Sequence, residues 1–531
     1  MSEQYDYIVV GGGSAGCVVA SRLVREFDAR VLLLEAGGND DSPLVSMPAG
    51  SFKMIFGGGE FVRTHQSIPQ PALGGRAVSI HQANLLGGGS SVNVMVYTRG
   101  SREDYGRWDD ICGKAGWDWN DILPYFMKHE GNQRFHNATH NGDGPLKVSE
   151  QPYVAEGSHY FVRTMQRLGV PFASDFNSGT LYGVGYQQAT LNAGKRCNAA
   201  RAFIDPIRSD PRLKISFRSK ATKILIENGR AIGVEFKDKS GVKHAFAKRE
   251  VILTAGALVT PKLLMLSGIG PAQQLKNHNI PVVSDLPGVG QNLQDHAGVM
   301  VVGSTRGAFG YHLQSSGWRM VRNAIQYALF RSGPVSSTGS EAVAFANIGK
   351  DSEEPDFQIY SLQMMWPGLV DKEDHGVTLM ANLLRPKSRG SITIASANPD
   401  DDPLIDFNWM SDPEDRRLFL KAFRYIRNIL KTNPLAAIIA KEAAPGANVD
   451  TDEDIAEYLR NTVTTNYHPC GTARMGRADD ELAVLTPDLR VRGVDGLRVM
   501  DASSFPTIIS ANTNAPTMAL ADRGVDLMMN A

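Results

Sequence analysis

The sequence predicts an α/β protein of two parts: a parallel sheet covered by helices, and an α+β part with an antiparallel sheet. The first part is indicated by residues 5–38, where an apolar run, a glycine-rich turn, a helical pattern and a second apolar run follow one another. The second is indicated by residues 311–459, where alternating runs are separated by turns that contain Pro and Gly. A length of 531 residues is sufficient for more than one core.

The N-terminal segment has the pattern of a strand–turn–helix–strand unit. Residues 7–10 are apolar and β-branched, as in a buried parallel strand, and residues 31–34 repeat that composition. Between them, a helix at 14–26 carries small residues that allow close packing on a sheet. The first strand ends in glycines with the spacing G-x-G-x-x-G: Gly11, Gly13 and Gly16.

This turn predicts a Rossmann-like dinucleotide site. Glycines allow backbone N–H groups to approach a pyrophosphate, and the positive end of the helix dipole favours the negative charge of that group. Glu35, at the end of the second strand, can accept hydrogen bonds from a ribose. The motif does not distinguish NAD from FAD, and a glycine-rich turn in an ordinary α/β domain is the alternative.

Composition and charge argue against several classes of protein. With 55 Lys and Arg against 56 Asp and Glu, the net charge of −1 gives no electrostatic reason to expect binding to nucleic acid or to an anionic membrane. The four cysteines are far apart, so we expect neither a disulfide framework nor a metal site, and a reducing cytoplasm is favoured. Neither a signal peptide nor a membrane span is expected.

Two segments before residue 150 are expected to lack regular structure. Residues 39–80 contain four prolines and the glycines 57–59, and such a loop is either a functional lid or an exposed connection. His136 and His140 have the spacing of metal ligands on a helix, but turn-forming residues surround them. We therefore expect a loop with two solvated histidines there.

Residues 83–100, ANLLGGGSSVNVMVYTRG, hold a dense Gly-Ser turn between apolar stretches. Such a turn allows backbone to approach a large flat ligand and offers it N–H and hydroxyl donors. Here the chain resembles the glucose–methanol–choline (GMC) oxidoreductases, whose first signature matches Asn84, Leu86, Gly87, Gly88, Ser90, Ser91 and Asn93. The resemblance implies that the segment packs against the pyrophosphate and isoalloxazine of FAD. Val92 stands where some members carry a histidine bonded to the flavin, which implies non-covalent FAD.

The middle of the chain continues both the sheet and the resemblance. Strands are expected at 213–217, 221–226, 231–236 and 251–255. A helix should follow, with Thr260 as its N-cap, Pro261 as its first residue and Gly268 as its stop. The second GMC signature matches Gly256, Thr260, Pro261, Leu263, Leu264, Ser267, Gly268, Ile269 and Gly270, and residues 285–296 resemble the family's following segment.

Residues 311–459 are expected to form the antiparallel sheet and its helices. Residues 356–362 and 377–384 alternate as strands, and a helix begins at 411–413. By resemblance this part binds the substrate, and its sheet covers the flavin. Residues 364–366 either line an apolar pocket or belong to the core, which we favour. A structural place is favoured for Glu341 as well.

The C-terminal residues carry the predicted chemistry. His468 lies in a rigid loop, NYHPCGTARMG; a lone histidine is usually structural. A helix then begins near Pro516, and its N-terminus can face negative charge that develops on a flavin. In GMC members a histidine in HPxGT and a His or Asn 44 residues later flank the flavin N5, which corresponds to His468 and Asn512. Imidazole titrates near neutral pH and can act as base, while a carboxamide hydrogen-bonds the alcohol oxygen.

The resemblance covers essentially the whole chain and implies FAD-dependent oxidation of a primary alcohol to an aldehyde. His468 would be the general base, Asn512 would orient the alcohol, and electrons would pass from the flavin to a quinone-type or artificial acceptor. An oxidase that uses O2 is one alternative, and a non-catalytic flavoprotein or a lyase on this fold is another. The alcohol is not identified, and both a monomer and a dimer stay open. We expect a cytoplasmic protein, with peripheral membrane association if a quinone is the acceptor.

The resemblance also implies a division of the chain. Residues 1–155, 195–310 and 460–531 are expected to form a discontinuous FAD-binding domain, and residues 156–194 and 311–459 the substrate-binding domain. The expected cofactor-binding residues are Gly11, Gly13, Ser14, Ala15, Gly16, Glu35, Ala36, Leu86, Gly87, Ser91, Asn93, Val94, Met95, Val96, Thr222, Ala255, Gly256, Asp501, Ala502, Asn512 and Thr513.

Overall fold

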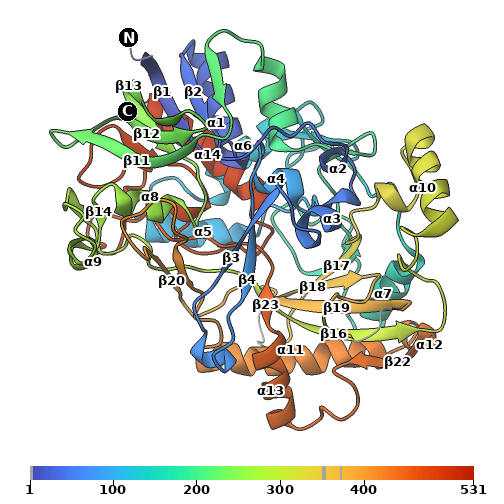
Figure 1. Ribbon diagram of the computed structural model, residues 1–531. Helices are drawn as coiled ribbons and strands as arrows, with labels where there is room; N and C mark the ends of the chain where they lie inside the picture. Colours follow the sequence, from blue (N-terminus) through green and yellow to red (C-terminus); the bar gives the residue numbers. More distant parts are fainter. Residues whose placement is uncertain (1–3, 350–353, 371–373, 531) are drawn as a thin grey trace.

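The computed structural model describes residues 4–349, 354–370 and 374–530, which fold around two large β-sheets (Figure 1). The sheet that contains the N-terminal strand lies at upper left in Figure 1, and the second sheet lies at lower right. Each sheet combines segments that are far apart in the sequence. The prediction of an α/β protein with two sheets is confirmed, and the first sheet is parallel except for β11 (Lys220–Glu227) and β12 (Arg230–Asp238), which join it antiparallel.

The first sheet follows the order β10-β2-β1-β13-β12-β11, with β24 beside β13. Its strands are β1 (Gln4–Val10), β2 (Val31–Leu34), β10 (Leu213–Ser216), β11 (Lys220–Glu227), β12 (Arg230–Asp238), β13 (Gly241–Leu253) and β24 (Leu497–Val499). β1 pairs in parallel with β2 and β13, whereas β11 and β12 form the predicted hairpin. β2 is buried throughout, which explains its continuously apolar sequence.

The two ends of the chain meet beside this sheet. α1 (Ser14–Phe27) packs against α14 (Asn514–Met529). Arg22 of α1 bonds Asp526 of α14 at 2.6 Å and also pairs with the buried Asp522. At the start of both helices, Ser14 Oγ donates to Asn514 Oδ1 at 2.7 Å. The N-termini of α1 and α14 therefore lie side by side.

The second sheet follows the order β22-β16-β19-β18-β17-β7, with β23 beside β16, and its pairs are antiparallel. Its strands are β7 (Gly183–Tyr186), β16 (Ala297–Thr305), β17 (Ala342–Ala346), β18 (Phe357–Leu362), β19 (Gly376–Leu383), β22 (Ile439–Ala444) and β23 (Thr464–Thr465). One face packs on helices that include α7 (Glu156–Arg167), α11 (Pro413–Lys431), α12 (Leu435–Ile438) and α13 (Asp452–Thr462). Because side chains alternate along a strand, Ile359 joins the core with α11 while Tyr360 faces the opposite side.

Shorter elements fill the space around the two sheets. The helices are α2 (Pro43–Ser46), α3 (Gly50–Phe56), α4 (Gly89–Val92), α5 (Arg102–Ile111), α6 (Trp119–His129), α8 (Thr260–Leu266), α9 (Ala272–Asn277) and α10 (Gly317–Phe330). The strands are β3 (Val62–Gln66), β4 (Ser79–Ala83), β5 (Glu130–Asn132), β6 (Leu146–Val148), β8 (Leu191–Asn192), β9 (Lys195–Arg196), β14 (Ile269–Gly270), β15 (Ser284–Asp285), β20 (Ser391–Thr393) and β21 (Leu404–Asp406). Across the described ranges, none of the helices combines the length and hydropathy that a membrane crossing requires.

Sheet membership differs from the predicted division of the chain at two strands. β16 and β23 were assigned to the FAD-binding part, but both pair within the second sheet. The reason is that β16 pairs with β19 from Gly298 to Ser304, so the chain crosses into the second sheet near residue 297.

Residues 39–80 contain regular structure, so the prediction of an irregular segment was wrong. Two of the four prolines begin helical turns: Pro43 is the first residue of α2, which Ser42 caps, and Pro71 is the first residue of a short 3-10 turn. β3 and β4 pair as an antiparallel hairpin from Val62 to Ala83. In Figure 1 this hairpin descends between the two sheets.

Two local predictions were also wrong. His140 is not solvated: its ring is buried, with Nδ1 3.0 Å from Glu130 Oε2 and Nε2 3.2 Å from Asp175 Oδ2. These carboxylates raise the pKa of His140, although burial opposes that shift. Thr260 is the first residue of α8 and not its N-cap, because its hydroxyl donates to Asp501 Oδ2 at 2.7 Å. Both errors arose because the partners are remote in the sequence.

Candidate active site

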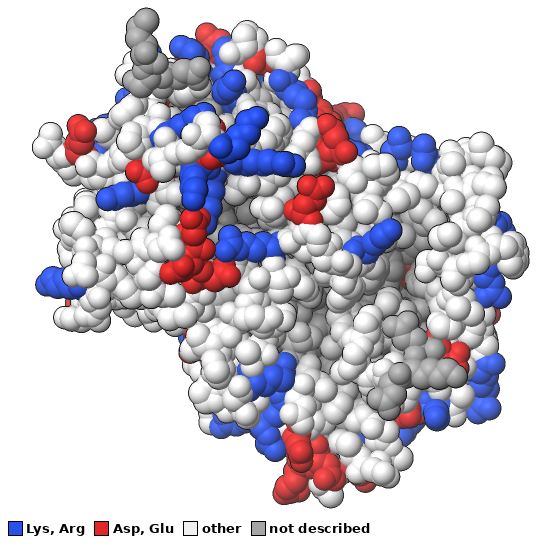
Figure 2. All heavy atoms as spheres, in the orientation of Figure 1, with Lys and Arg blue, Asp and Glu red and all other residues white. Residues whose placement is uncertain are grey.

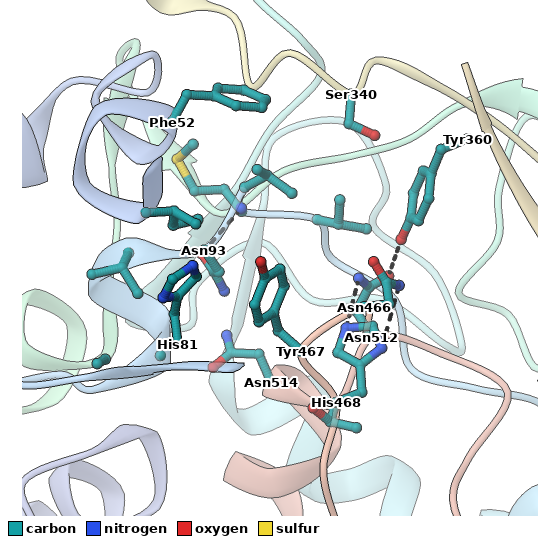
Figure 3. Close-up of a pocket in the computed structure, with 18 of the residues that line it drawn as sticks. Phe52, His81, Asn93, Ser340, Tyr360, Asn466, Tyr467, His468, Asn512 and Asn514 are labelled. Atoms are coloured by element: carbon teal, nitrogen blue, oxygen red, sulfur yellow. Dashed lines mark hydrogen bonds between the residues drawn. The ribbon is translucent and has the colours of Figure 1, made fainter. Parts of the chain in front are cut away.

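A cavity of about 270 Å³ lies between the N-terminal ends of α1 and α14 and the strands β18 and β19 of the second sheet (Figure 3). Its apolar lining residues are Phe52, Ile55, Phe56, Val62, Ala83, Gly89, Val92, Val94, Met95, Val96, Leu362, Trp366 and Met380. Its polar lining residues are Ser14, His81, Asn93, Ser340, Tyr360, Asn466, Tyr467, His468, Asn512, Thr513, Asn514 and Thr517. Among these described lining residues there is no Asp, Glu, Lys or Arg.

The loop that carries His468 is fixed by a buried carboxylate. Asp295 Oδ1 accepts the His468 N–H at 2.8 Å, and its Oδ2 accepts the Thr465 hydroxyl at 2.5 Å. Burial raises the pKa of Asp295 to about 7, despite these hydrogen bonds. Tyr467, just before the histidine, has a left-handed backbone with φ of 61°, which non-glycine residues rarely adopt. The surrounding bonds therefore hold the loop before His468 in a backbone conformation that the local sequence does not favour.

A chain of hydrogen bonds sets the proton positions on His468. His296 Nε2 lies 3.1 Å from the carbonyl oxygen of Leu384, so this nitrogen carries the proton. His296 Nδ1 is then an acceptor, and it lies 2.9 Å from His468 Nδ1. The neutral His468 ring consequently carries its proton on Nδ1, which leaves the lone pair of Nε2 directed toward Asn512.

The amide of Asn512 is oriented by three donors on its oxygen. The Oδ1 atom accepts from the Tyr360 hydroxyl at 3.1 Å, from Thr98 Oγ1 at 3.2 Å and from Gln358 Nε2 at 3.3 Å. The Nδ2 group is therefore turned toward His468 Nε2, at 3.2 Å (Figure 3). An unprotonated imidazole nitrogen and an amide N–H thus lie together at the cavity wall.

Burial keeps this pair of histidines neutral. Burial is the main cause that lowers the pKa of His468 well below its ordinary value, and the neighbouring His296 lowers it further. Burial also lowers the pKa of His296 to about 4. At neutral pH the Nε2 atom of His468 is therefore able to accept a proton.

Glycines bring two backbone segments together beside the cavity. The Gly87 N–H donates to the Gly12 carbonyl at 2.7 Å, and a Cβ on Gly88 would lie 2.7 Å from Gly13 Cα. Gly89, at the start of α4, lines the cavity, and a Cβ added to it would meet no atom within 4 Å. The Gly-Ser turn and the N-terminal glycine turn therefore pack together at the N-termini of α1 and α14, where backbone N–H groups favour negative charge.

A second, smaller cavity adjoins the first glycine. It is lined by Val10, Gly11, Leu34, Ala36, Ser219, Lys220, Ala221, Ala255, Val259, Lys262, Leu263, Leu266 and Pro399. Glu35 lies beside it at the end of β2 and is buried, and its carboxylate accepts the N–H groups of Gly12 at 2.9 Å and Gly37 at 2.7 Å. Burial raises the pKa of Glu35, while these backbone bonds oppose the shift.

Comparison with known protein families identifies this arrangement. The N-terminal family model of the GMC oxidoreductases matches residues 5–298, and the C-terminal model matches residues 386–521. The chain belongs to the GMC oxidoreductase family. The resemblance inferred from the sequence is confirmed.

Similar GMC proteins cover nearly the whole chain. An alcohol dehydrogenase (acceptor) of Pseudomonas putida is 39% identical over 534 residues, which cover 99% of this chain and 96% of that protein. An oxygen-dependent choline dehydrogenase of Sinorhizobium fredii is 38% identical, over 98% of this chain and 95% of that protein. Among solved structures, a formate oxidase of Aspergillus oryzae has a TM-score of 0.92 at 26% identity, and the match covers 100% of this chain and 98% of that chain. That structure addresses the effect of a mutation on FAD modification in the oxidase.

The predicted site residues of this GMC chain fall into three groups. The main cavity is lined by Ser14, Asn93, Val94, Met95, Val96, His468, Asn512 and Thr513. The second cavity is lined by Gly11, Ala36 and Ala255. Outside both linings are Gly13, Ala15, Gly16, Glu35, Leu86, Gly87, Ser91, Thr222, Gly256, Asp501 and Ala502.

Two residues of the third group have their side chains engaged elsewhere. The Thr222 hydroxyl donates to Glu235 Oε1 at 2.7 Å. The buried Asp501 carboxylate accepts the Gly256 N–H at 2.8 Å and the Thr260 hydroxyl at 2.7 Å. Asp501 therefore ties the segment before α14 to the start of α8, and its contribution to a ligand site would be through backbone.

Sequence reasoning missed much of the cavity wall. Phe52, Ile55, Phe56 and Val62 come from the segment predicted to be irregular, and its spacing gave no signal for them. His81 and Ala83 follow that segment on β4, and neither was predicted as a site residue. Tyr360, Leu362 and Met380 lie on strands whose alternating pattern was visible in the sequence. The pattern did not show which side of each strand would face the cavity. Trp366 lines the cavity, whereas Met365 is buried in the core, which is the place that the sequence analysis favoured for residues 364–366. Glu341 is buried, and it accepts a hydrogen bond from the Ser158 hydroxyl at 2.7 Å.

Proposed function

We propose that this chain is an FAD-dependent dehydrogenase that oxidises an uncharged primary alcohol to the aldehyde. The observation that carries the proposal is the His468 Nε2 atom, unprotonated and 3.2 Å from Asn512 Nδ2, in a cavity that adjoins the two glycine turns. This is the donor and acceptor set that alcohol oxidation requires, because a hydroxyl proton and a hydride must both leave.

The residues present fit FAD. A Cβ on Gly11 would lie 2.6 Å from the Thr254 carbonyl oxygen, so only glycine allows the turn to pack this closely on the neighbouring strand. Such a turn is the one that binds a pyrophosphate. Gly11, Gly13, Gly16 and Glu35 would hold the ADP half, and the segment 93–96 with Thr513 would lie nearer the ring. Val92 lines the cavity without a nucleophile, which supports non-covalent binding. When bound, FAD accepts the hydride from the alcohol carbon.

The protein's own part in the reaction is to position the alcohol and remove its proton. Asn512 Nδ2 would donate to the alcohol oxygen, and His468 Nε2 would accept the hydroxyl proton. The resulting imidazolium would keep its Nδ1 hydrogen bond to His296, and the bonds to Asp295 would keep the loop in place. His296 and Asp295 are positioning residues in this scheme.

The lining favours an uncharged and largely apolar alcohol. The described lining residues carry no carboxylate that could neutralise a cation, while Phe52, Phe56 and Trp366 offer apolar surface.

The preferred acceptor is a quinone or an artificial dye, and the alternative is O2. We retain the two-domain division, with the second boundary moved to about residue 297 because of β16. Monomer and dimer are both compatible with this proposal.

The test is anaerobic reduction of the purified holoenzyme. A panel should include benzyl alcohol, 1-hexanol and choline, and bleaching of the flavin absorbance should occur with the uncharged alcohols. Admission of air then separates an oxidase, in which the colour returns within seconds, from a dehydrogenase, in which it returns with an added quinone or dye. A yellow protein that no alcohol bleaches would contradict the proposed activity and favour a non-catalytic flavoprotein or a lyase.

The rate of flavin reduction should depend little on pH near neutrality. His468 must be neutral to accept a proton, and its pKa lies well below the ordinary 6.5. The rate should therefore stay constant as pH falls from 8 through 6.5 and decline only at lower pH, where the ring becomes protonated. Anaerobic stopped-flow reduction with one alcohol across this range is the measurement. A titration midpoint between pH 6.5 and 8 that persists in Asp295→Asn, which removes the carboxyl with a pKa of about 7, would contradict the neutral, buried base.

A further inference from the structure

α10 (Gly317–Phe330) is amphipathic, but it faces the protein with its polar side. Its buried residues are Asn323 and Tyr327, whose side chains bond the carbonyl oxygens of Gln314 at 2.9 Å and Gly194 at 3.1 Å. Most other helices of the chain bury their apolar side. α10 therefore rests on the protein through hydrogen bonds and leaves its apolar side outward.

The outward side of α10 is the largest run of exposed apolar side chains in the described residues. Trp318, Val321, Ile325 and Leu329 follow one another at helical spacing on one face, and Trp318 and Leu329 are each 69% exposed. Met320 and Phe330 are exposed as well, but helical geometry places them off this face. In Figure 1 the helix stands at the right-hand edge of the molecule, and in Figure 2 the surface there is largely white with basic residues at its margin. Contiguous apolar surface of this kind marks an interaction site.

The charged residues of α10 and of the sequence that flanks it are of one sign. Between Asp295 and Glu341 the sequence contains no acidic residue but four arginines: Arg306, Arg319, Arg322 and Arg331. The Arg322 guanidinium lies 5.1 Å from the centre of the Trp318 ring, at the apolar face itself. A symmetric contact between two copies would bring these arginines against each other. An anionic bilayer surface, by contrast, complements both the arginines and the apolar side chains.

We propose that α10 is a membrane-docking helix that lies in the interface of an anionic phospholipid bilayer. Its apolar face would enter the boundary between headgroups and acyl chains, and its arginines would contact lipid phosphates. The chain leads from α10 directly into the cavity wall: the Val335 carbonyl accepts the Ala49 N–H at 3.2 Å just before α3, and Ser340 lines the cavity. Docking would thus bring the wall of the active-site cavity near a phase that dissolves apolar alcohols and quinones.

Vesicle flotation of the full-length holoenzyme tests the proposal. Vesicles of phosphatidylcholine with phosphatidylglycerol should retain the protein more strongly than vesicles of phosphatidylcholine alone. The pair Trp318→Gln and Leu329→Gln should lower the partition coefficient about tenfold or more, because two large side chains no longer enter the bilayer. The triple change of Arg319, Arg322 and Arg331 to Gln should remove the preference for the anionic vesicles.

A matched control is available on another surface. Val242 is 62% and Leu482 is 49% exposed, so Val242→Gln with Leu482→Gln removes exposed apolar area away from α10 and should leave vesicle binding unchanged. Anaerobic flavin reduction should be unchanged in all variants, which reports that they are folded. Absence of binding by the unmodified protein, or equal loss in the control, would overturn the proposal. So would a dimer, seen by sedimentation, that the α10 pair dissociates while vesicle binding is absent.

Discussion

Replacing His468 by alanine is expected to slow flavin reduction by an alcohol by about 10²–10⁴-fold, the range for loss of a general base. The cause is specific to one atom: Nε2 of His468 is the unprotonated nitrogen that faces Asn512 in the cavity. The ring also fills space beside His296, so the variant should be compared at equal flavin content. Stopped-flow absorbance under anaerobic conditions gives the rate directly.

The control for this prediction is His136→Ala. His136 is an exposed histidine outside the cavity, so its loss should leave the rate unchanged. A His468→Ala protein that holds FAD and is reduced at the normal rate would show that another group takes the hydroxyl proton. In that case Tyr360 is a poor substitute, because burial raises the pKa of its hydroxyl to about 12 and it already donates to Asn512.

Replacing Gly16 by alanine is expected to reduce the FAD content of the purified protein by about tenfold or more. A Cβ at this position would lie 1.9 Å from the Gly11 carbonyl oxygen and 2.8 Å from Thr254 Oγ1. Backbone must move to relieve this contact, and the turn that would bind the pyrophosphate opens. The measurement is flavin absorbance per protein, with circular dichroism to report whether the fold is retained.

Gly106→Ala is the matched control. Gly106 lies within α5, where an added Cβ meets nothing within 4 Å, and alanine favours a helix interior. Its FAD content should equal that of the unmodified protein. If Gly16→Ala is folded and fully yellow, the glycine turn is not the cofactor site, and the assignment of the ADP half to it fails.

The sequence determined those features whose physical cause is local. The turn from Gly11 to Gly16 could be recognised because strand, glycine spacing and helix are consecutive, and each has its own composition. The hairpin of β11 and β12 followed from Asn228-Gly229 for the same reason. His468 and Asn512 were selected by resemblance, and the fold brings them to 3.2 Å although no local rule required it.

Only the tertiary structure decided what depends on distant partners. The proton positions on His468 follow from His296 and Leu384, which no spacing connects to it. His140 is buried because its ring nitrogens bond the carboxylates of Glu130 and Asp175, although its neighbours in the sequence form turns. The near-zero net charge concealed the basic, apolar face of α10, since total charge carries no information about position. A helical pattern predicts which residues share a face, but only packing determines whether that face is buried or exposed.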